Sequence, residues 1–174
     1  MLTPEIEAWL LTLNDTNHME IFPYDPTCVQ KFELIRDKIR RHMGEETEVV
    51  HGGASSLGIS GQKEIDVYVP VPAAKLTAAV AALTEVFGKP GNAYPDRIRF
   101  RGKVEDTKID LFAINKASSD WLNHNAFMQH LARDPAALSA YARLKEEASG
   151  CSTREYYRRK NEFLYSILEL TKTK

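Results

Sequence analysis

The segment Glu-Ile-Asp-Val-Tyr-Val-Pro-Val places the strongest limit on how this chain folds. Its β-branched and aromatic residues favour a strand, in which successive side chains point to opposite faces of a sheet. Ile65, Val67 and Val69 then share one face, whereas Glu64 and Asp66 share the other. The first face has to be covered by apolar residues, and the second places two carboxylates where they need a cationic partner.

The rest of the chain alternates between helical and strand patterns and ends in helices. This order predicts an α+β fold, a small mixed sheet with N-terminal helices and a C-terminal helical half folded onto it. A sheet of four strands is marginal alone, so the helices are expected to share its core. We expect helices at 3–14, 24–44, 73–88, 119–134, 135–150 and 152–172, strands at 47–53 and 64–71, and two strands within 97–114.

Length and charge narrow the class of protein. The chain has 174 residues, so we expect one domain over 1–174, with a sheet-bearing core at about 20–116 and a helical part at about 117–174. The formal net charge is −1, so an anion site has to come from local clustering, and long nucleic acid is not favoured as a partner.

The cysteines and the apolar runs indicate the compartment. Cys28 and Cys151 lack metal-type spacing and are predicted to be reduced packing residues. No apolar run approaches the roughly 20 residues that span a bilayer, and the N-terminus has no secretory pattern. We therefore expect a cytoplasmic protein without a membrane partner.

A third acid, Asp110, stands between apolar neighbours in Lys-Ile-Asp-Leu-Phe-Ala-Ile. Three acids that converge from two strands repel one another unless a cation lies between them. Mg²⁺ prefers oxygen ligands, so Glu64, Asp66 and Asp110 are predicted metal ligands, with Mn²⁺ as an alternative ion. In the structural alternative, Asp66 pairs with Lys63 or a C-terminal arginine and Asp110 is a hydrogen-bonded structural acid.

A glycine- and serine-rich segment precedes the acids. Gly52 and Gly53 permit backbone N–H groups to approach a phosphate closely, and Ser55 and Ser56 add hydroxyl donors. Nucleotidyl transfer needs both a triphosphate cradle and metal-binding carboxylates, and this segment is predicted to supply the cradle. His51 is expected to be a packed, hydrogen-bonded side chain that positions the segment.

The motif resembles that of the DNA polymerase beta-like nucleotidyltransferase superfamily, a glycine turn, an acid-x-acid pair on a strand and a later acid. Over about residues 20–170 the chain also resembles the GrpB family within that superfamily. The matching positions are Tyr24, Asp25, Pro26, His51, Gly53, Asp66, His124, Phe127, Pro135, Tyr141, Lys145, Tyr156, Lys160 and Phe163.

Three departures from the family pattern concern the site. The chain has Gly-Ala-Ser-Ser-Leu-Gly-Ile-Ser-Gly where members have Gly-Ser-Thr-Ser followed by Val-Pro-Gly. Glu64 and Asp110 stand near positions where members have proline and histidine, and Met128 and Gln129 replace the expected arginine and aspartate.

The resemblance implies a nucleotidyltransferase-type sheet and a Mg²⁺-dependent enzyme. Such an enzyme moves a nucleoside monophosphate from a nucleoside triphosphate to a hydroxyl acceptor that the sequence does not identify. The alternatives are a catalytically silent nucleotide-binding or partner-binding module of the same fold, and a structural protein whose acids pair with the basic C-terminal helix.

The C-terminal helices add candidate cations. Lys160 lies on one helical stripe with Tyr156 and Phe163, and Lys145 follows Tyr141 by four residues. We expect Lys160 first and Lys145 second to balance phosphate charge, and Tyr156 to stack on a base. The basic run of Arg154, Arg158, Arg159 and Lys160 is more typical of a solvated helix face.

Overall fold

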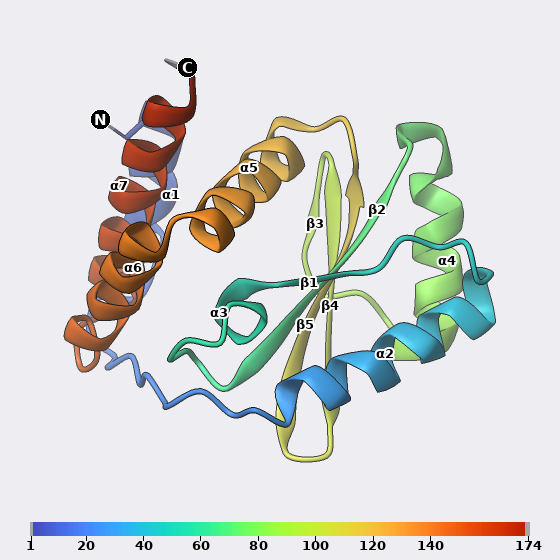
Figure 1. The fold of residues 1–174 in the computed structure, drawn as a ribbon. Coiled ribbons are helices and arrows are strands. Elements are labelled where there is room, and N and C mark those ends of the chain that lie inside the picture. Colours follow the sequence, from blue (N-terminus) through green and yellow to red (C-terminus); the bar gives the residue numbers. More distant parts are fainter. Residues whose placement is uncertain (1, 173–174) are drawn as a thin grey trace. The chain divides into compact units, whose positions relative to one another are not determined.

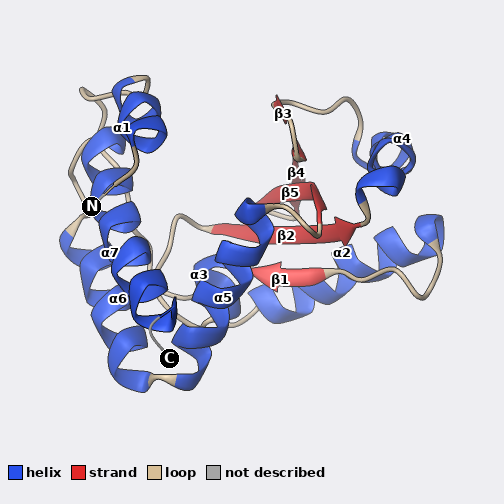
Figure 2. Cartoon of the chain, turned by 90° about the horizontal axis from the view of Figure 1, so that it is seen from above, coloured by secondary structure: helices blue, strands red, loops and turns tan. Residues whose placement is uncertain are grey.

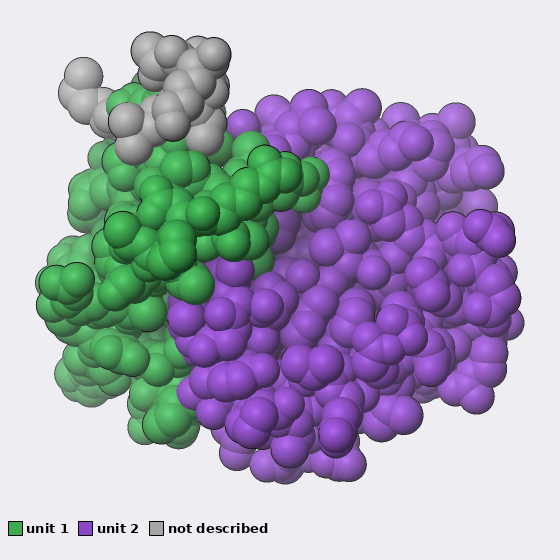
Figure 3. Space-filling model, viewed as in Figure 1, with its two compact units in different colours: residues 1–23, 60–62, 125–174 green, residues 24–59, 63–124 purple. Residues whose placement is uncertain are grey.

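A computed structural model of the chain describes residues 2–172. Packing within the chain divides it into two compact units, which Figure 3 colours separately. Unit 1 comprises residues 1–23, 60–62 and 125–174, and unit 2 comprises residues 24–59 and 63–124. The prediction of a single domain over 1–174 stays a prediction.

Unit 2 is built on a mixed five-stranded sheet. The strand order is β1-β2-β5-β4-β3, with β1 and β3 at opposite edges, as Figure 2 shows. The β2–β5 pair is parallel and the other pairs are antiparallel. The strands are β1 (Val50–Gly52), β2 (Glu64–Val71), β3 (Ala93–Tyr94), β4 (Arg97–Val104) and β5 (Thr107–Asn115).

The predicted α+β class and mixed sheet are confirmed. One strand was missed, because β3 has only two residues and lies outside the ranges expected for strands. The glycine- and serine-rich segment contains the short helix α3 (Gly53–Ser56), which the expected elements did not include.

Two helices cover one face of the sheet. They are α2 (Cys28–Met43) and α4 (Leu76–Phe87), which follows the 3-10 turn η1 (Ala73–Lys75), and Figure 1 shows both on the same side. The predicted inward face of β2 is confirmed, because Ile65, Val67 and Val69 have no exposed surface. They share a core with side chains of both helices, Phe32, Ile35, Ile39 and Leu83, and of the neighbouring strands, Phe100, Ile109, Leu111 and Ala113.

A buried lysine fixes α2 to the turn between β4 and β5. The Nζ of Lys31 donates to Thr107 Oγ1 at 2.7 Å and lies 3.3 Å from Asp25 Oδ2 and 3.4 Å from Asp106 Oδ1. Its side chain is 8% exposed, so these oxygens replace the water that the ammonium loses. The turn residue Glu105 has a φ of 52°, as a tight hairpin requires.

Unit 1 is helical. It contains α1 (Pro4–Leu11), α6 (Pro135–Glu147), α7 (Thr153–Lys172) and the second part of α5 (Ser119–Arg133). Thr3 and Asp134 cap α1 and α6 with their side chains, and a proline occupies the first helical position of each. The six helices that the sequence predicts are therefore confirmed.

The basic run of α7 binds α1. Arg158 donates to both carboxylate oxygens of Glu7, at 3.0 and 2.8 Å. Arg154 donates to Leu10 O at 3.2 Å and to Asp15 Oδ2 at 2.7 Å. These two arginines are structural contacts rather than parts of a solvated face. None of the helices in the described part of the chain is long and apolar enough to cross a membrane.

Candidate functional site

The face of the sheet opposite to α2 and α4 brings the candidate carboxylates into one row. Gly52 of β1 is paired with Asp66 of β2, Asp66 with Asp110 of β5, and Asp110 with Arg101 of β4. Glu64 lies one pleat away from Asp66 on the same face. The sheet therefore confirms that the glycine turn, the acid pair and the later acid are neighbours.

The carboxylate of Asp66 fills the space beside the glycine turn. Gly53 has a φ of 66°, a left-handed conformation that L side chains rarely adopt, and a Cβ at this position would overlap Asp66 Oδ2. A Cβ on Gly52 would lie 2.6 Å from the ring of Tyr68. The two glycines are needed because side chains of β2, Tyr68 and Asp66, occupy the space where their Cβ atoms would lie.

Asp110 already has a cationic partner. Arg99 of β4 donates through Nε and Nη2 to the two carboxylate oxygens of Asp110 in a bidentate pair. Asp110 is 7% exposed, and the guanidinium also lies 5.7 Å from the ring centroid of Phe112. The pair balances the charge for which the sequence analysis expected a divalent cation.

The residues present fit a Mg²⁺ site of two carboxylates better than one of three. Among residues 2–172, no group of three histidine, cysteine or acidic side chains is placed to hold a metal ion. Mg²⁺ commonly binds through one or two carboxylates, with substrate phosphates and water as its other ligands. Glu64 and Asp66 fit that requirement, and the role predicted for Asp110 would require Arg99 to release it.

His51 is half-buried behind the glycine turn. Its ring stacks on Phe32 with centroids 4.5 Å apart, and its Nε2 lies 3.0 Å from Ser55 Oγ. Burial lowers the pKa of His51 to about 4, so the imidazole is neutral near pH 7. The expected packed, hydrogen-bonded histidine is confirmed, and it holds the Ser55 hydroxyl, which is itself buried.

Ser56 is also engaged, because its Oγ donates to Gly53 O at 2.9 Å. The two serine hydroxyls therefore stabilise the turn around α3. Their predicted role as phosphate donors stays a prediction, as does that of the backbone at Gly52 and Gly53.

A row of basic side chains on β4 was missed by the sequence analysis. Alternate residues of a strand share a face, so this basic row comprises Arg97, Arg99, Arg101 and Lys103. Arg97 is paired with Asp120 and lies 4.6 Å from the ring centroid of Tyr94. The Arg-Ile-Arg-Phe-Arg-Gly-Lys alternation was the signal that could have revealed it.

The outer part of the basic row is open. Arg101 and Lys103 are exposed, and among residues 2–172 no side chain pairs with either of them. Positive charge therefore flanks the carboxylates despite the net charge of −1, which supplies the local clustering that an anion site requires.

The candidate cations of the C-terminal helices lie in unit 1. Lys145 is 3% exposed, and its Nζ lies 5.4 Å from the ring centroid of Tyr141 and 5.8 Å from that of Tyr156. Lys160 is less buried, and its Nζ is 5.6 Å from the ring centroid of Tyr157. Lys145 is thus the lysine enclosed by aromatic rings, the position expected for Lys160.

Tyr156 has no exposed surface, so its ring is part of the helical core of unit 1. The predicted roles of Lys145, Tyr156 and Lys160 in nucleotide binding stay predictions. The site as the structure places it within one unit consists of Gly52, Gly53, Ser55, Ser56, Glu64, Asp66 and Asp110, with the basic row beside them.

Comparison with solved structures identifies the fold. The crystal structure of the conserved protein GrpB from Enterococcus faecalis is similar, with a TM-score of 0.63 and 17% identity over 84% of this chain and 98% of that chain. A structure of the GLD-2/RNP-8 complex has a TM-score of 0.49 and 15% identity over 91% of this chain and 62% of that chain. A comparison with curated proteins finds no match.

The mixed sheet with its row of carboxylates beside a glycine turn is a nucleotidyltransferase-like fold. The family model described as GrpB protein matches residues 18–170. The chain therefore belongs to the GrpB family.

Proposed function

We propose that this protein binds the triphosphate of a nucleotide at the Gly52–Gly53 turn and transfers a nucleoside monophosphate to a hydroxyl acceptor. The observation that carries the proposal is the direct approach of the Asp66 carboxylate to the backbone of Gly53. A phosphate held by that turn would lie next to the acid that binds its counter-ion, which is the proximity that transfer requires.

Glu64 and Asp66 would hold Mg²⁺ or Mn²⁺. The bound ion would supply charge stabilisation at the phosphates. The acceptor oxygen would form a bond to the α-phosphorus, the bond from that phosphorus to the bridging oxygen would break, and pyrophosphate would leave. The hydroxyl proton would pass to Asp110 once Arg99 has turned from it to the anionic ligand.

Cationic side chains would balance the charge of the ligand. Arg101 and Lys103 are open on the carboxylate face and would attract an anionic ligand. Lys145 and Lys160 would balance phosphate charge, and Tyr156 would contribute its ring to base binding. The cytoplasm, where both cysteines would remain reduced, would supply the nucleotide.

A second candidate is a silent nucleotide-binding module of the same fold. The bidentate pair between Arg99 and Asp110 favours it, because this pair occupies the acid that transfer would need. Glu64, one methylene longer than an aspartate, places its carboxylate differently from that of Asp66. This candidate predicts nucleotide affinity without release of pyrophosphate.

Calorimetric titration of a non-hydrolysable ATP analogue tests the binding step. We expect binding with Mg²⁺ or Mn²⁺ that is lost in EDTA, in Asp66→Asn and in Glu64→Gln. Glu85→Gln is the matched control, because Glu85 is an exposed acid on α4. Failure of ATP, GTP, CTP and UTP analogues to bind the wild type under every condition would contradict both candidates.

Release of pyrophosphate from labelled triphosphate separates the two candidates. Turnover with a panel of hydroxyl acceptors that disappears in Asp66→Asn supports transfer. Metal-dependent binding without turnover supports the silent module. Turnover that survives in Asp66→Asn would overturn the assigned site.

A further inference from the structure

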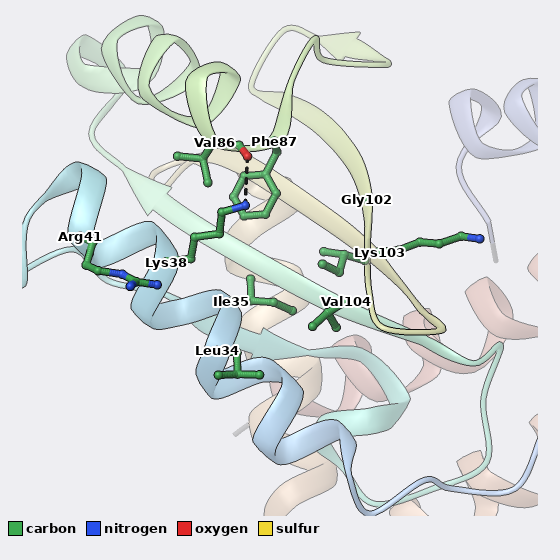
Figure 4. Close-up of a pocket in the computed structure, with 10 residues that line it drawn as sticks. Leu34, Ile35, Lys38, Arg41, Val86, Phe87, Gly102, Lys103 and Val104 are labelled. Atoms are coloured by element: carbon green, nitrogen blue, oxygen red, sulfur yellow. Dashed lines mark hydrogen bonds between the residues drawn. The ribbon is translucent and has the colours of Figure 1, made fainter.

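The helix-covered side of the sheet in unit 2 contains a pocket of about 440 Å³ where α4 ends. Its apolar lining comes from α2, the last turn of α4 and the β4–β5 hairpin, and Figure 4 shows how these side chains surround it. The apolar lining residues are Leu34, Ile35, Val86, Phe87, Val104 and Ile109. Sites for small molecules commonly enclose roughly 300–1,000 Å³ and are mostly apolar, so the pocket has a suitable size and surface.

The pocket is open at one wall because Gly102 has no side chain there. α4 ends at Phe87, and the next residue, Gly88, turns the chain away with a φ of 80°. Gly102 of β4 leaves the floor open, since a Cβ there would meet only Ile109 Cδ1 at 3.9 Å and Phe87 Cδ1 at 4.0 Å. Both distances are ordinary van der Waals contacts, so a larger residue at 102 would extend into the pocket without disturbing the strand.

Cations border the apolar lining. The Nζ of Lys38 lies 5.2 Å from the ring centroid of Phe87 and donates to Val86 O at 3.3 Å, the bond drawn in Figure 4. Arg41 lies one helical turn further along α2 and also lines the pocket. Figure 4 shows Lys103 directed away from the apolar side chains, so Lys38 and Arg41 supply the positive charge.

No acidic side chain is among the described residues that line this pocket. The apolar body of a ligand would therefore be buried in the pocket, and a negatively charged head group would interact with Lys38 and Arg41. A neutral or cationic ligand of the same shape would gain only the apolar contact. The charge distribution thus selects for the sign of the ligand as well as for its shape.

We propose that this pocket is a binding site for a small amphiphile, an aliphatic or aromatic body with one carboxylate or phosphate head group. The site lies on the face of the sheet opposite to Asp66 and Asp110, so it is separate from the proposed nucleotide site. Two of its residues, Lys38 and Gly102, determine its charge and its volume.

Binding can be measured by ¹H–¹⁵N chemical-shift titration of the whole protein with octanoate and, separately, octyl phosphate. We expect saturable shifts at backbone amides around Phe87 and Gly102, with dissociation constants of the order of 1 mM. The tighter of the two probes identifies the head group. Octylammonium has the same body with the opposite charge, and acetate has the head group without the body, so neither should bind.

Two variants with matched controls locate the site. Gly102→Val should reduce affinity at least tenfold by filling the pocket, whereas Gly91→Val should not. Gly91 is a suitable control because a Cβ there meets only Arg99 O at 3.7 Å. Lys38→Met should weaken binding about tenfold while it preserves the contact with Phe87, and Lys75→Met, an exposed lysine outside the pocket, should leave binding unchanged.

Three results would overturn the proposal. They are the absence of saturable shifts below about 10 mM for both anionic probes, equal binding of octylammonium, and unchanged octanoate affinity in a folded Gly102→Val protein. Asp66→Asn should bind octanoate normally, so failure of the nucleotide site and failure of this pocket can be distinguished.

Discussion

On the helix-covered face of the sheet, β2 and β5 present side chains such as Val67 and Leu111 that have no exposed surface. On the opposite face, the same two strands present Glu64, Asp66 and Asp110. Stability on the first face comes from volume and close packing. On the second face, charge pairs and the backbone conformation of the glycine turn hold the side chains in place. Both depend on a few specific positions. One pair of strands therefore contributes residues both to the core and to the candidate site.

The largest expected effect is a loss of stability from a cavity on the helix-covered face. Leu111→Ala should lower the free energy of unfolding by about 3 kcal/mol, because it removes buried methyl groups and leaves a cavity. Leu122→Ala is the control, since Leu122 on α5 is 55% exposed and should change stability by no more than about 0.5 kcal/mol. Urea denaturation of both variants measures the difference in their free energies of unfolding. Equal losses of stability would show that Leu111 is not packed more closely than Leu122.

The next effect tests charge pairing on the opposite face. Arg99→Gln should cost about 2 kcal/mol, because it leaves the Asp110 carboxylate without its bidentate partner in a position where it is 7% exposed. Arg101→Gln, on the same strand and open to solvent, should cost less than about 0.5 kcal/mol. The same denaturation experiment compares them.

A double variant sharpens this test. Arg99→Gln combined with Asp110→Asn should cost less than the sum of the two single changes, because neither group is then left with an uncompensated charge. Additive costs would mean that the two side chains do not interact in solution.

A pH dependence tests the helix-covered face at His51, whose ring stacks on Phe32 of α2. Burial depresses the pKa of His51 from 6.5 to about 4, so between these values the unfolded chain binds a proton that the folded chain does not. Stability should therefore fall as the pH decreases from 6.5 to about 4, and His51→Gln should remove part of that slope. Thermal unfolding across this range provides the measurement.

His42→Gln is the control for the pH test, because His42 is exposed on α2. An identical slope in His51→Gln and in the wild type would contradict the assigned neutral histidine. Lys63 and Lys31 hold the pKa of the Asp106 carboxyl below its ordinary value. Protonation of carboxylates such as Asp106 should therefore lower the stability of the fold only at lower pH.

The sequence predicted these faces because strand alternation is a local property. The positions of Ile65, Val67 and Val69 relative to Asp66 follow from the period of two, and the structure agrees. The glycine turn and the acids were also found from short spacing. The pairing of Arg99 with Asp110 could not be derived in the same way, because it depends on the register between β4 and β5.

The lysines show a second limit of sequence reasoning. Helical spacing identified which residues share a stripe with Lys160 or Lys145 but not which stripe the fold encloses. Packing within unit 1 buries Lys145 and leaves Lys160 partly exposed. Lys31 was not singled out for a related reason, since its partners Asp106 and Thr107 are distant in the sequence.

The contact between α1 and α7 has a consequence for synthesis of the chain. α1 leaves the ribosome before every other element described here, yet its partners Arg154 and Arg158 belong to the last helix. Closing a contact across so many residues is slow compared with local pairing. The segment from 24 to 124, which contains all of unit 2, is complete before α7 exists. During translation the sheet of unit 2 can therefore form before Arg154 and Arg158 are available to α1.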